Sequence, residues 1–160
     1  LPVDHENFHW KKIGLGAENK SNFQTLEKMM SENGHTMKSG MVLKIDIEGG
    51  EWEALNNCSE ELLSKFDQII LELHGLVKLQ SHEIILKTLE LLSRTHLVAH
   101  IHGNNYGCVE YCGDLMTPNL LEVTYLNKRI YSFTNRNGCI ESELDRPNRS
   151  DIPDIHLNSW

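Results

Sequence analysis

The stretch Leu43-Lys44-Ile45-Asp46-Ile47-Glu48-Gly49-Gly50-Glu51-Trp52-Glu53 decides the fold of this chain. Its first half alternates apolar and polar residues, which is the period of a half-buried strand. Gly49 and Gly50 allow a sharp reversal, because glycine tolerates positive φ. The residues after them are typical of a helix start, with carboxylates at its positive end. Asp46 and Glu48 therefore end a strand directly before a helix, where open α/β sheets bind ligands.

A second buried strand is predicted at residues 68–74, where the sequence Gln-Ile-Ile-Leu-Glu-Leu-His is apolar on both faces at its start. We expect it to be adjacent and parallel to the first strand, residues 41–47, so that Glu72 and His74 emerge beside Asp46 and Glu48. Carboxylates gathered in this way disfavour one another's ionisation and attract histidine protons or a cation. The pattern therefore predicts one polar site at the carboxyl edge of the sheet.

The other elements follow from hydrophobic spacing and from turn residues. The pattern predicts further strands at residues 8–13, 97–101, 120–126 and 129–133, and helices at residues 21–32, 51–63 and 81–94. The last two strands form a pair or one bent strand. This order implies an α/β domain with a mainly parallel sheet and an antiparallel end. Residues 1–9 are predicted as a loop or frayed end and residues 134–160 as a polar C-terminal tail.

Composition excludes several classes of protein. The 160 residues suit a single domain, and a net charge of −8 argues against nucleic acid as the main partner. No apolar run approaches the roughly 20 residues of a membrane-spanning helix. Because the chain begins with Leu1 rather than Met, we expect it to be processed or part of a longer protein.

The compartment and the cysteine chemistry stay open. The cysteine spacing does not fit a zinc site, so both disulfides and free thiols are consistent with Cys58, Cys108, Cys112 and Cys139. Asn-x-Ser acceptor patterns slightly favour a secretory or Golgi setting; they begin at Asn19, Asn57 and Asn148.

Several segments in order resemble the FkbM-type methyltransferases and the related animal methyltransferase-like domains. Besides residues 43–52 these are Ile13-Gly14-Leu15-Gly16, Thr25-Leu26, residues 68–74, His102-Gly103-Asn104-Asn105 and residues 121–125. The resemblance covers nearly the whole chain, from Trp10 to Asn148. It implies a Rossmann-like class I methyltransferase sheet, of which this chain supplies strands three to seven, and S-adenosylmethionine as cofactor.

The resemblance also implies roles for single residues. The Gly14-Leu15-Gly16 turn would lie near the cofactor's adenine, while Asp46 and Glu48 would face its methionine end or the acceptor. The acceptor side would be formed by Glu72, Asn104 and Asn105. For a hydroxyl acceptor on a sugar or small natural product, a base within hydrogen-bond reach assists the transfer. The candidates for that catalytic group are Asp46, His74 and His102, and no metal ligand is assigned.

One part of the family pattern is not found. The loop Asp-x-Gly-x-x-x-Gly that wraps the cofactor's methionine, and the acidic residue for its ribose, have no counterpart before Trp10. We therefore expect the C-terminal portion of a methyltransferase domain, a chain completed by another copy, or a domain that has lost catalysis. Two other functions remain open: a non-catalytic binding or scaffolding domain, and a metal-dependent hydrolase that uses Asp46, Glu48, His74 and the His100/His102 pair.

Overall fold

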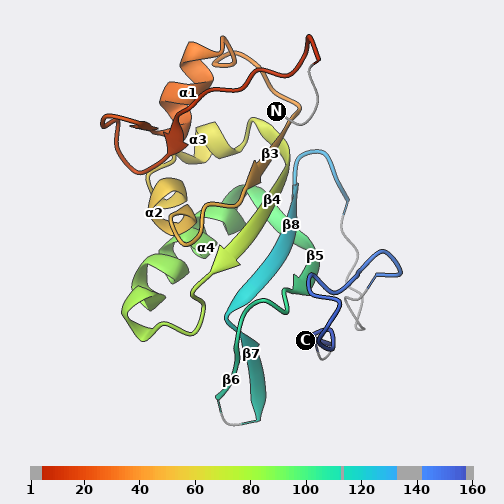
Figure 1. Ribbon diagram of the computed structural model, residues 1–160. Helices are drawn as coiled ribbons and strands as arrows, with labels where there is room; N and C mark the ends of the chain where they lie inside the picture. Colours follow the sequence, from red (N-terminus) through yellow and green to blue (C-terminus); the bar gives the residue numbers. More distant parts are fainter. Residues whose placement is uncertain (1–4, 113, 133–141, 158–160) are drawn as a thin grey trace.

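The computed structural model describes residues 5–112, 114–132 and 142–157, and its centre is a four-stranded sheet of order β3-β4-β8-β5 (Figure 1). The strands are Met41–Ile45 (β3), Phe66–His74 (β4), Leu120–Asn127 (β8) and His96–Gly103 (β5). β3 and β4 are parallel, and β8 is antiparallel to both β4 and β5. The predicted parallel pairing of residues 41–47 with 68–74 is confirmed. The sheet is mainly parallel in strand direction, but its antiparallel strand lies inside the sheet rather than at its end.

The helices lie close to their predicted places, with one division. They are Leu26–Glu32 (α1), Glu51–Asn56 (α2), Glu60–Leu63 (α3) and His82–Thr95 (α4), the last preceded by a 3₁₀ turn at Leu79–Ser81 (η1). The predicted helix over residues 51–63 is two helices. Ser59 ends the first run, because its backbone is extended and its hydroxyl accepts a hydrogen bond from the Leu62 N–H at 3.1 Å. Ser59 is thus the N-cap of a new helix.

The two faces of the sheet differ in character. On β4, Ile69, Leu71 and Leu73 are at most 2% exposed, and they pack with apolar side chains of the helices. Glu72, between two of them in sequence, points to the opposite face, since successive side chains of a strand alternate. In Figure 1 the helices α1 to α3 lie to the left of β4, and the C-terminal segment lies to the right of β5. We call the face that carries Glu72 the open face.

The N-terminal part differs from its prediction. Residues 8–13 form no strand, and the predicted Gly-x-Gly turn is instead a short strand, Gly14–Leu15 (β1), parallel to Phe23–Gln24 (β2). A Cβ on Gly14 would lie 2.6 Å from the Phe23 ring, so this close approach requires glycine. Because residues 23–24 pair with β1, the predicted helix over 21–32 begins only at Leu26.

The chain after β5 also differs. Sequence reasoning missed an antiparallel hairpin, Val109–Cys112 (β6) and Leu115–Pro118 (β7). The strand predicted at residues 129–133 does not form over residues 129–132, and residue 133 lies outside the described residues. The chain turns there because the Asn127 carbonyl accepts backbone hydrogen bonds from Ile130 and Tyr131, both at 3.2 Å.

The C-terminal segment, residues 142–157, packs against the end of β5. Ile155 forms an isolated antiparallel bridge with Gly103, and Leu157 is buried. A Cβ on Gly103 would lie 2.7 Å from Cγ2 of Ile155, so glycine lets the two backbones approach. Trp160 and Cys139 lie outside the described residues, as does the side chain of Cys112, while Cys58 and Cys108 are free thiols. Among the described residues, no helix is long and apolar enough to cross a membrane.

Candidate functional site

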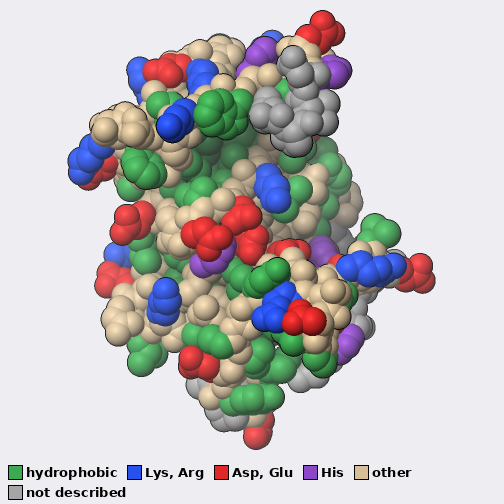
Figure 2. All heavy atoms as spheres, in the orientation of Figure 1, with side chains coloured by type: hydrophobic (Ala, Val, Ile, Leu, Met, Phe, Trp, Pro, Cys, Tyr) green, Lys and Arg blue, Asp and Glu red, His purple; other side chains and the backbone are tan. Residues whose placement is uncertain are grey.

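Polar side chains from four strands form a row across the open face, at the carboxyl end of β4. Glu72 is paired in register with Glu122 of β8, which is paired with His102 of β5. Asp46 directly follows β3 and lies against Glu72, within reach of a hydrogen bond between the two carboxyls. Figure 2 shows acidic side chains gathered around a histidine in the middle of this face. Side chains in register across a sheet lie about 5 Å apart, so the row is one continuous site.

The turn between β3 and α2 brings a further carboxylate to this row. Glu48 has a φ of 56° and Gly49 a φ of 102°, a left-handed pair that reverses the chain. The Gly49 N–H donates to Oε2 of Glu51 at 2.9 Å and fixes the turn. Oε2 of the exposed Glu48 then lies 3.5 Å from Nε2 of His74.

The buried carboxylate of Glu51 orients His74. Its Oε1 accepts the His74 backbone N–H at 2.7 Å and lies 3.2 Å from Nδ1 of the ring. The Trp52 indole N–H donates to the His74 carbonyl at 2.7 Å, which fixes the end of β4 against α2. A carboxylate beside Nδ1 favours the tautomer that carries its proton there. Nε2 is then left to face Glu48 and Glu72, the latter at 3.9 Å.

Glu72 is the carboxyl with the most perturbed surroundings in the row. The Asn104 side-chain amide donates to its Oε1 at 2.9 Å and lies 3.4 Å from Oε1 of Glu122. Burial raises the pKa of Glu72, and the hydrogen bond and negative charge of Asp46 raise it further, while His74 opposes them. The site therefore holds a proton more readily than isolated carboxylates do.

Two predicted site residues are engaged with the C-terminal segment. Both oxygens of Asp154 lie 3.2 Å from Nε2 of the buried His102. Asn105, which is expected beside the acceptor, accepts the Arg149 N–H at 2.7 Å and donates to the Arg149 carbonyl at 3.0 Å. His100 likewise lies 2.8 Å from Asp145. The structure thus gathers Asp46, Glu48, Glu72, His74 and Asn104, and places His102 and Asn105 at the boundary with the C-terminal segment.

A cavity of about 350 Å³ is lined in part by Gly50 of the β3–α2 turn. It contains two of the three residues predicted near the adenine; its lining is Leu15, Gly16, Ala17, Glu18, Lys20, Phe23, Gly50 and Glu53. Gly14 does not line it, because the Phe23 ring covers that position. The Gly49-Gly50 turn therefore adjoins both this cavity, which Gly50 lines, and the carboxylate row, which Glu48 reaches through His74.

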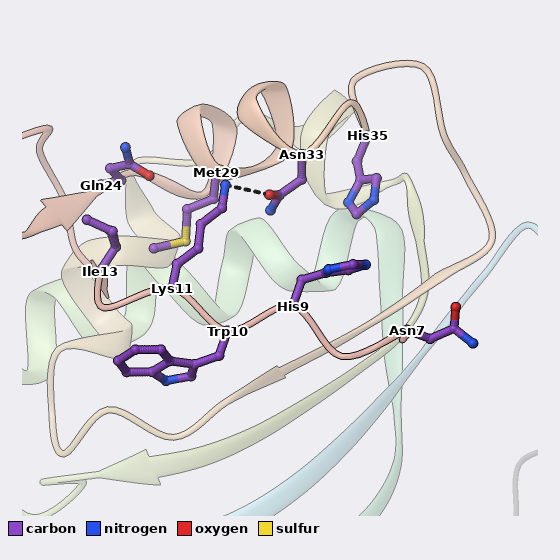
Figure 3. A pocket seen from close by; sticks show the side chains of 9 residues that line it. All are labelled: Asn7, His9, Trp10, Lys11, Ile13, Gln24, Met29, Asn33 and His35. Atoms are coloured by element: carbon purple, nitrogen blue, oxygen red, sulfur yellow. Dashed lines mark hydrogen bonds between the residues drawn. The ribbon is translucent and has the colours of Figure 1, made fainter. Parts of the chain in front are cut away.

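A second cavity, of about 640 Å³, lies between the N-terminal segment and α1 and contains no predicted site residue. Figure 3 shows Lys11 reaching Asn33 at the end of α1, where Nζ donates to Oδ1 at 2.7 Å, while Trp10 points to the opposite side of the segment. The predicted site lies elsewhere in the molecule.

Sequence reasoning missed three residues that shape the site. Glu51 was interpreted only as a charge at a helix start, and nothing local reveals that its carboxylate turns to β4. Glu122 carries a usable signal, because it is polar between Leu121 and Val123 of a strand and so must face away from the core. Asp154 lies 52 residues from His102, and no local pattern predicts such a contact.

Comparisons with known proteins give one result. No curated protein and no solved structure matches the chain. The family model described as "Methyltransferase FkbM domain" matches residues 20–106, which include β3, β4 and β5 and the cluster of Asp46, Glu72 and His74. The predicted resemblance is thereby confirmed: the chain belongs to the FkbM methyltransferase domain family.

Proposed function

We propose that this domain transfers a methyl group from S-adenosylmethionine to a hydroxyl of a sugar or small natural product. The observation that carries the proposal is the position of the Gly49-Gly50 turn. Gly50 lines a cavity of ligand size, and Glu48, the residue directly before the two glycines, reaches His74 of the cluster that also contains Asp46 and Glu72. A cofactor lying across this turn would have its adenosine in the cavity and its methyl group near the carboxylate row.

The residues of the cavity fit the adenosine end of the cofactor. Its volume of about 350 Å³ falls in the range of small-molecule pockets, roughly 300–1,000 Å³. Phe23, 54% exposed, and Leu15 supply apolar surface for a planar base, and the Glu53 carboxylate is a suitable acceptor for ribose hydroxyls. Asp46 and Glu48 match the positive ammonium group at the methionine end.

The chemistry asked of the protein is modest. S-adenosylmethionine, when bound, supplies a methyl group already activated on a sulfonium. The protein must align the acceptor oxygen with it and take up the hydroxyl proton. His74 suits that second task, because Glu51 holds Nδ1 and stabilises the imidazolium that forms when Nε2 accepts a proton. Asn104 and Glu72 offer hydrogen-bond partners for further hydroxyls of a sugar-like acceptor.

We further propose that the sheet continues beyond β3. Among the described residues, β3 has a strand neighbour on one side only, and its Val42 is 61% exposed. An unpaired strand edge with exposed apolar surface readily accepts another strand. Strands added there, from elsewhere in the protein or from a second copy, would supply the N-terminal part of the class I sheet and the remaining contacts to the cofactor's methionine.

Titration calorimetry with S-adenosylmethionine tests the proposal. We expect saturable binding and about tenfold weaker binding for Phe23→Ala, because loss of one stacked aromatic ring costs roughly 1–3 kcal/mol. Phe8→Ala is the matched control, since Phe8 is similarly exposed, at 56%, and does not line the cavity. Thermal melts confirm that both variants are folded. Absence of binding to the wild-type protein at millimolar cofactor would overturn the proposal and favour the non-catalytic alternative.

A further inference from the structure

We propose that Asp46, Glu72 and His74 bind a first-row divalent cation, with Mn²⁺ as the best match to their donor atoms. One carboxylate oxygen of each acid and one ring nitrogen of His74 lie within 4.8 Å of one another. Two donors about 2.1 Å from the same ion lie at most about 4.2 Å apart. The 3.9 Å between Nε2 of His74 and Oε1 of Glu72 already meets this limit, and the exposed Asp46 lies against Glu72.

An independent feature supports a metal ligand at His74. Metal-binding histidines usually donate their second ring N–H to a carboxylate or carbonyl, which fixes the ring and presents the other nitrogen to the ion. Glu51 fills this role. It is completely buried, comes from α2 rather than from the row, and accepts at Nδ1 while it also binds the His74 backbone. The Glu72 carbonyl lies at 3.2 Å from the same nitrogen. The ring is therefore held with Nε2 directed toward Glu72.

The charge of the surroundings supports a cation. The carboxylates around the proposed ion are those of Asp46, Glu48, Glu72 and Glu122. Within the described ranges, no Lys or Arg forms an ion pair with any of these four. Their neighbours are histidines and amides, which leaves a negative excess on this part of the open face. A divalent ion would offset it.

The mixed ligand set selects the kind of ion. Mg²⁺ and Ca²⁺ prefer oxygen ligands alone, whereas an imidazole nitrogen beside two carboxylates suits Mn²⁺ and the later first-row metals. In the proposed methyltransferase such an ion would also ligate the acceptor oxygen, and this role rests on the proposed function. Because Nε2 of His74 would then be a ligand, the ion would replace proton uptake by His74: it would lower the pKa of the acceptor hydroxyl so that the proton passes to water. Metal binding itself does not depend on methyl transfer and can be measured separately.

The test is a titration of the metal-free protein with Mn²⁺. Binding is measured by calorimetry and by the loss of the electron paramagnetic resonance signal of free Mn²⁺. We expect one saturable site per chain. Glu72→Gln and His74→Gln should each weaken it at least tenfold, because each removes a ligand. Glu90→Gln is the control: it makes the same substitution at an exposed position of α4, outside the row, and should change the affinity by less than about threefold, since only a distant surface charge is removed. Mg²⁺ should compete poorly.

Three results would overturn the proposal: no saturable Mn²⁺ binding, an equal loss of affinity in Glu90→Gln, or Mg²⁺ bound as tightly as Mn²⁺. If a ligand variant fails to fold, nuclear magnetic resonance of the wild-type protein decides, because bound Mn²⁺ must broaden the His74 ring signals before those of His100. Cofactor titration of the same metal-free protein separates the two proposals. If the protein binds the cofactor but not Mn²⁺, the metal-site proposal fails and the methyltransferase proposal stands. If it binds Mn²⁺ but not the cofactor, the methyltransferase proposal fails and the metal-site proposal stands.

Discussion

A single oxygen of Glu51 binds both the backbone and the ring of His74, at 2.7 Å from the backbone nitrogen and 3.2 Å from Nδ1. This contact ties the first residue of α2 to the last residue of β4. Glu51 is completely buried, and its carboxylate accepts hydrogen bonds from N–H groups around it, including that of Gly49. The carboxylate therefore serves two purposes: it joins two elements of the fold and it sets the orientation of the histidine.

Replacing this carboxylate should cost stability. In Glu51→Gln the amide keeps one acceptor oxygen but places an N–H₂ group against N–H donors. We expect the free energy of unfolding to fall by about 2–4 kcal/mol, the usual range for breaking a buried charged contact. Urea unfolding measures it. The control is Glu53→Gln on the same helix, where the side chain is exposed and the change should be below about 0.5 kcal/mol.

The sheet core should not accept a charge at Ile45. This residue is 3% exposed on β3, whereas Val42 on the same strand is 61% exposed. Ile45→Asp strands a carboxylate in an apolar interior, which costs several kcal/mol, comparable to the whole stability of a domain. We expect that variant to lose its cooperative thermal transition and Val42→Asp to keep it. A cooperatively melting Ile45→Asp protein would show that the residue is not part of the core.

The sequence was sufficient to predict the features that follow from regular spacing of apolar and polar residues. The period of two in residues 43–47 and 68–74 predicts both strands, and strand parity predicts that Asp46 and Glu72 meet at one edge. The apolar spacing of residues 81–94 predicts a helix that the structure has at His82–Thr95. In each case the signal is repeated over several residues and tertiary contacts reinforce it.

Other features depend on contacts between distant parts of the chain. Recognising Thr25 as the N-cap would have given the predicted helix its later start. The pairing of Phe23 with Gly14, in contrast, leaves no periodic pattern in the sequence and could not be predicted. The contact between His102 and Asp154 requires the C-terminal segment to return across β5, and only the bare Cα of Gly103 makes room for it. The place of β8 inside the sheet is likewise set by long-range pairing.

The same glycine offers a test of how the C-terminal segment docks. In Gly103→Ala the new Cβ would lie 2.7 Å from Cγ2 and 2.8 Å from Cβ of Ile155. Overpacking of this kind typically costs 1–3 kcal/mol, so residues 142–157 should be cleaved several-fold faster in limited proteolysis. The double variant Gly103→Ala/Ile155→Gly removes both clashing carbons and should recover part of the protection. No recovery would mean that the effect arises elsewhere in β5.

His96 should make stability depend on pH. The side chain is completely buried, with Nε2 at 3.0 Å from the Phe66 carbonyl and Nδ1 at 2.8 Å from the Thr95 hydroxyl. Burial lowers the pKa of His96 in the folded protein, assisted by Arg129 and Lys128 and opposed by the Phe66 carbonyl and Asp67. The unfolded chain therefore binds the proton more readily.

The direction of the effect follows from this difference. The stabilisation is present above the ordinary histidine pKa of about 6.5 and is lost as pH falls below it, at no more than about 1.4 kcal/mol per pH unit. Urea unfolding at pH 7.5 and 5.5 should show a smaller loss on acidification for His96→Gln than for the wild type. An equal loss in both proteins would remove His96 as a source of acid sensitivity.

Asp46 provides the sharpest test of catalysis. Its carboxylate extends β3 to the row, against Glu72, and is exposed to an incoming ligand. Asp46→Asn keeps the shape of the side chain and removes its charge from a position directed at the reacting groups. Loss of one such electrostatic contact should lower turnover at least about tenfold without loss of the fold.

Turnover is measured as transfer of a labelled methyl group from S-adenosylmethionine to a panel of sugar and natural-product alcohols, at matched folded fraction. Asp67→Asn is the control, because it makes the same carboxylate-to-amide change on β4, five residues before Glu72 and toward the amino end of the strand. That variant should retain wild-type turnover within about twofold, since a charge at the amino end of β4 is distant from the reacting groups. Equal rates for wild type and Asp46→Asn would exclude Asp46 from the reaction. Equal losses in both variants would mean that the total negative charge of the sheet, rather than a group at its carboxyl edge, governs the rate.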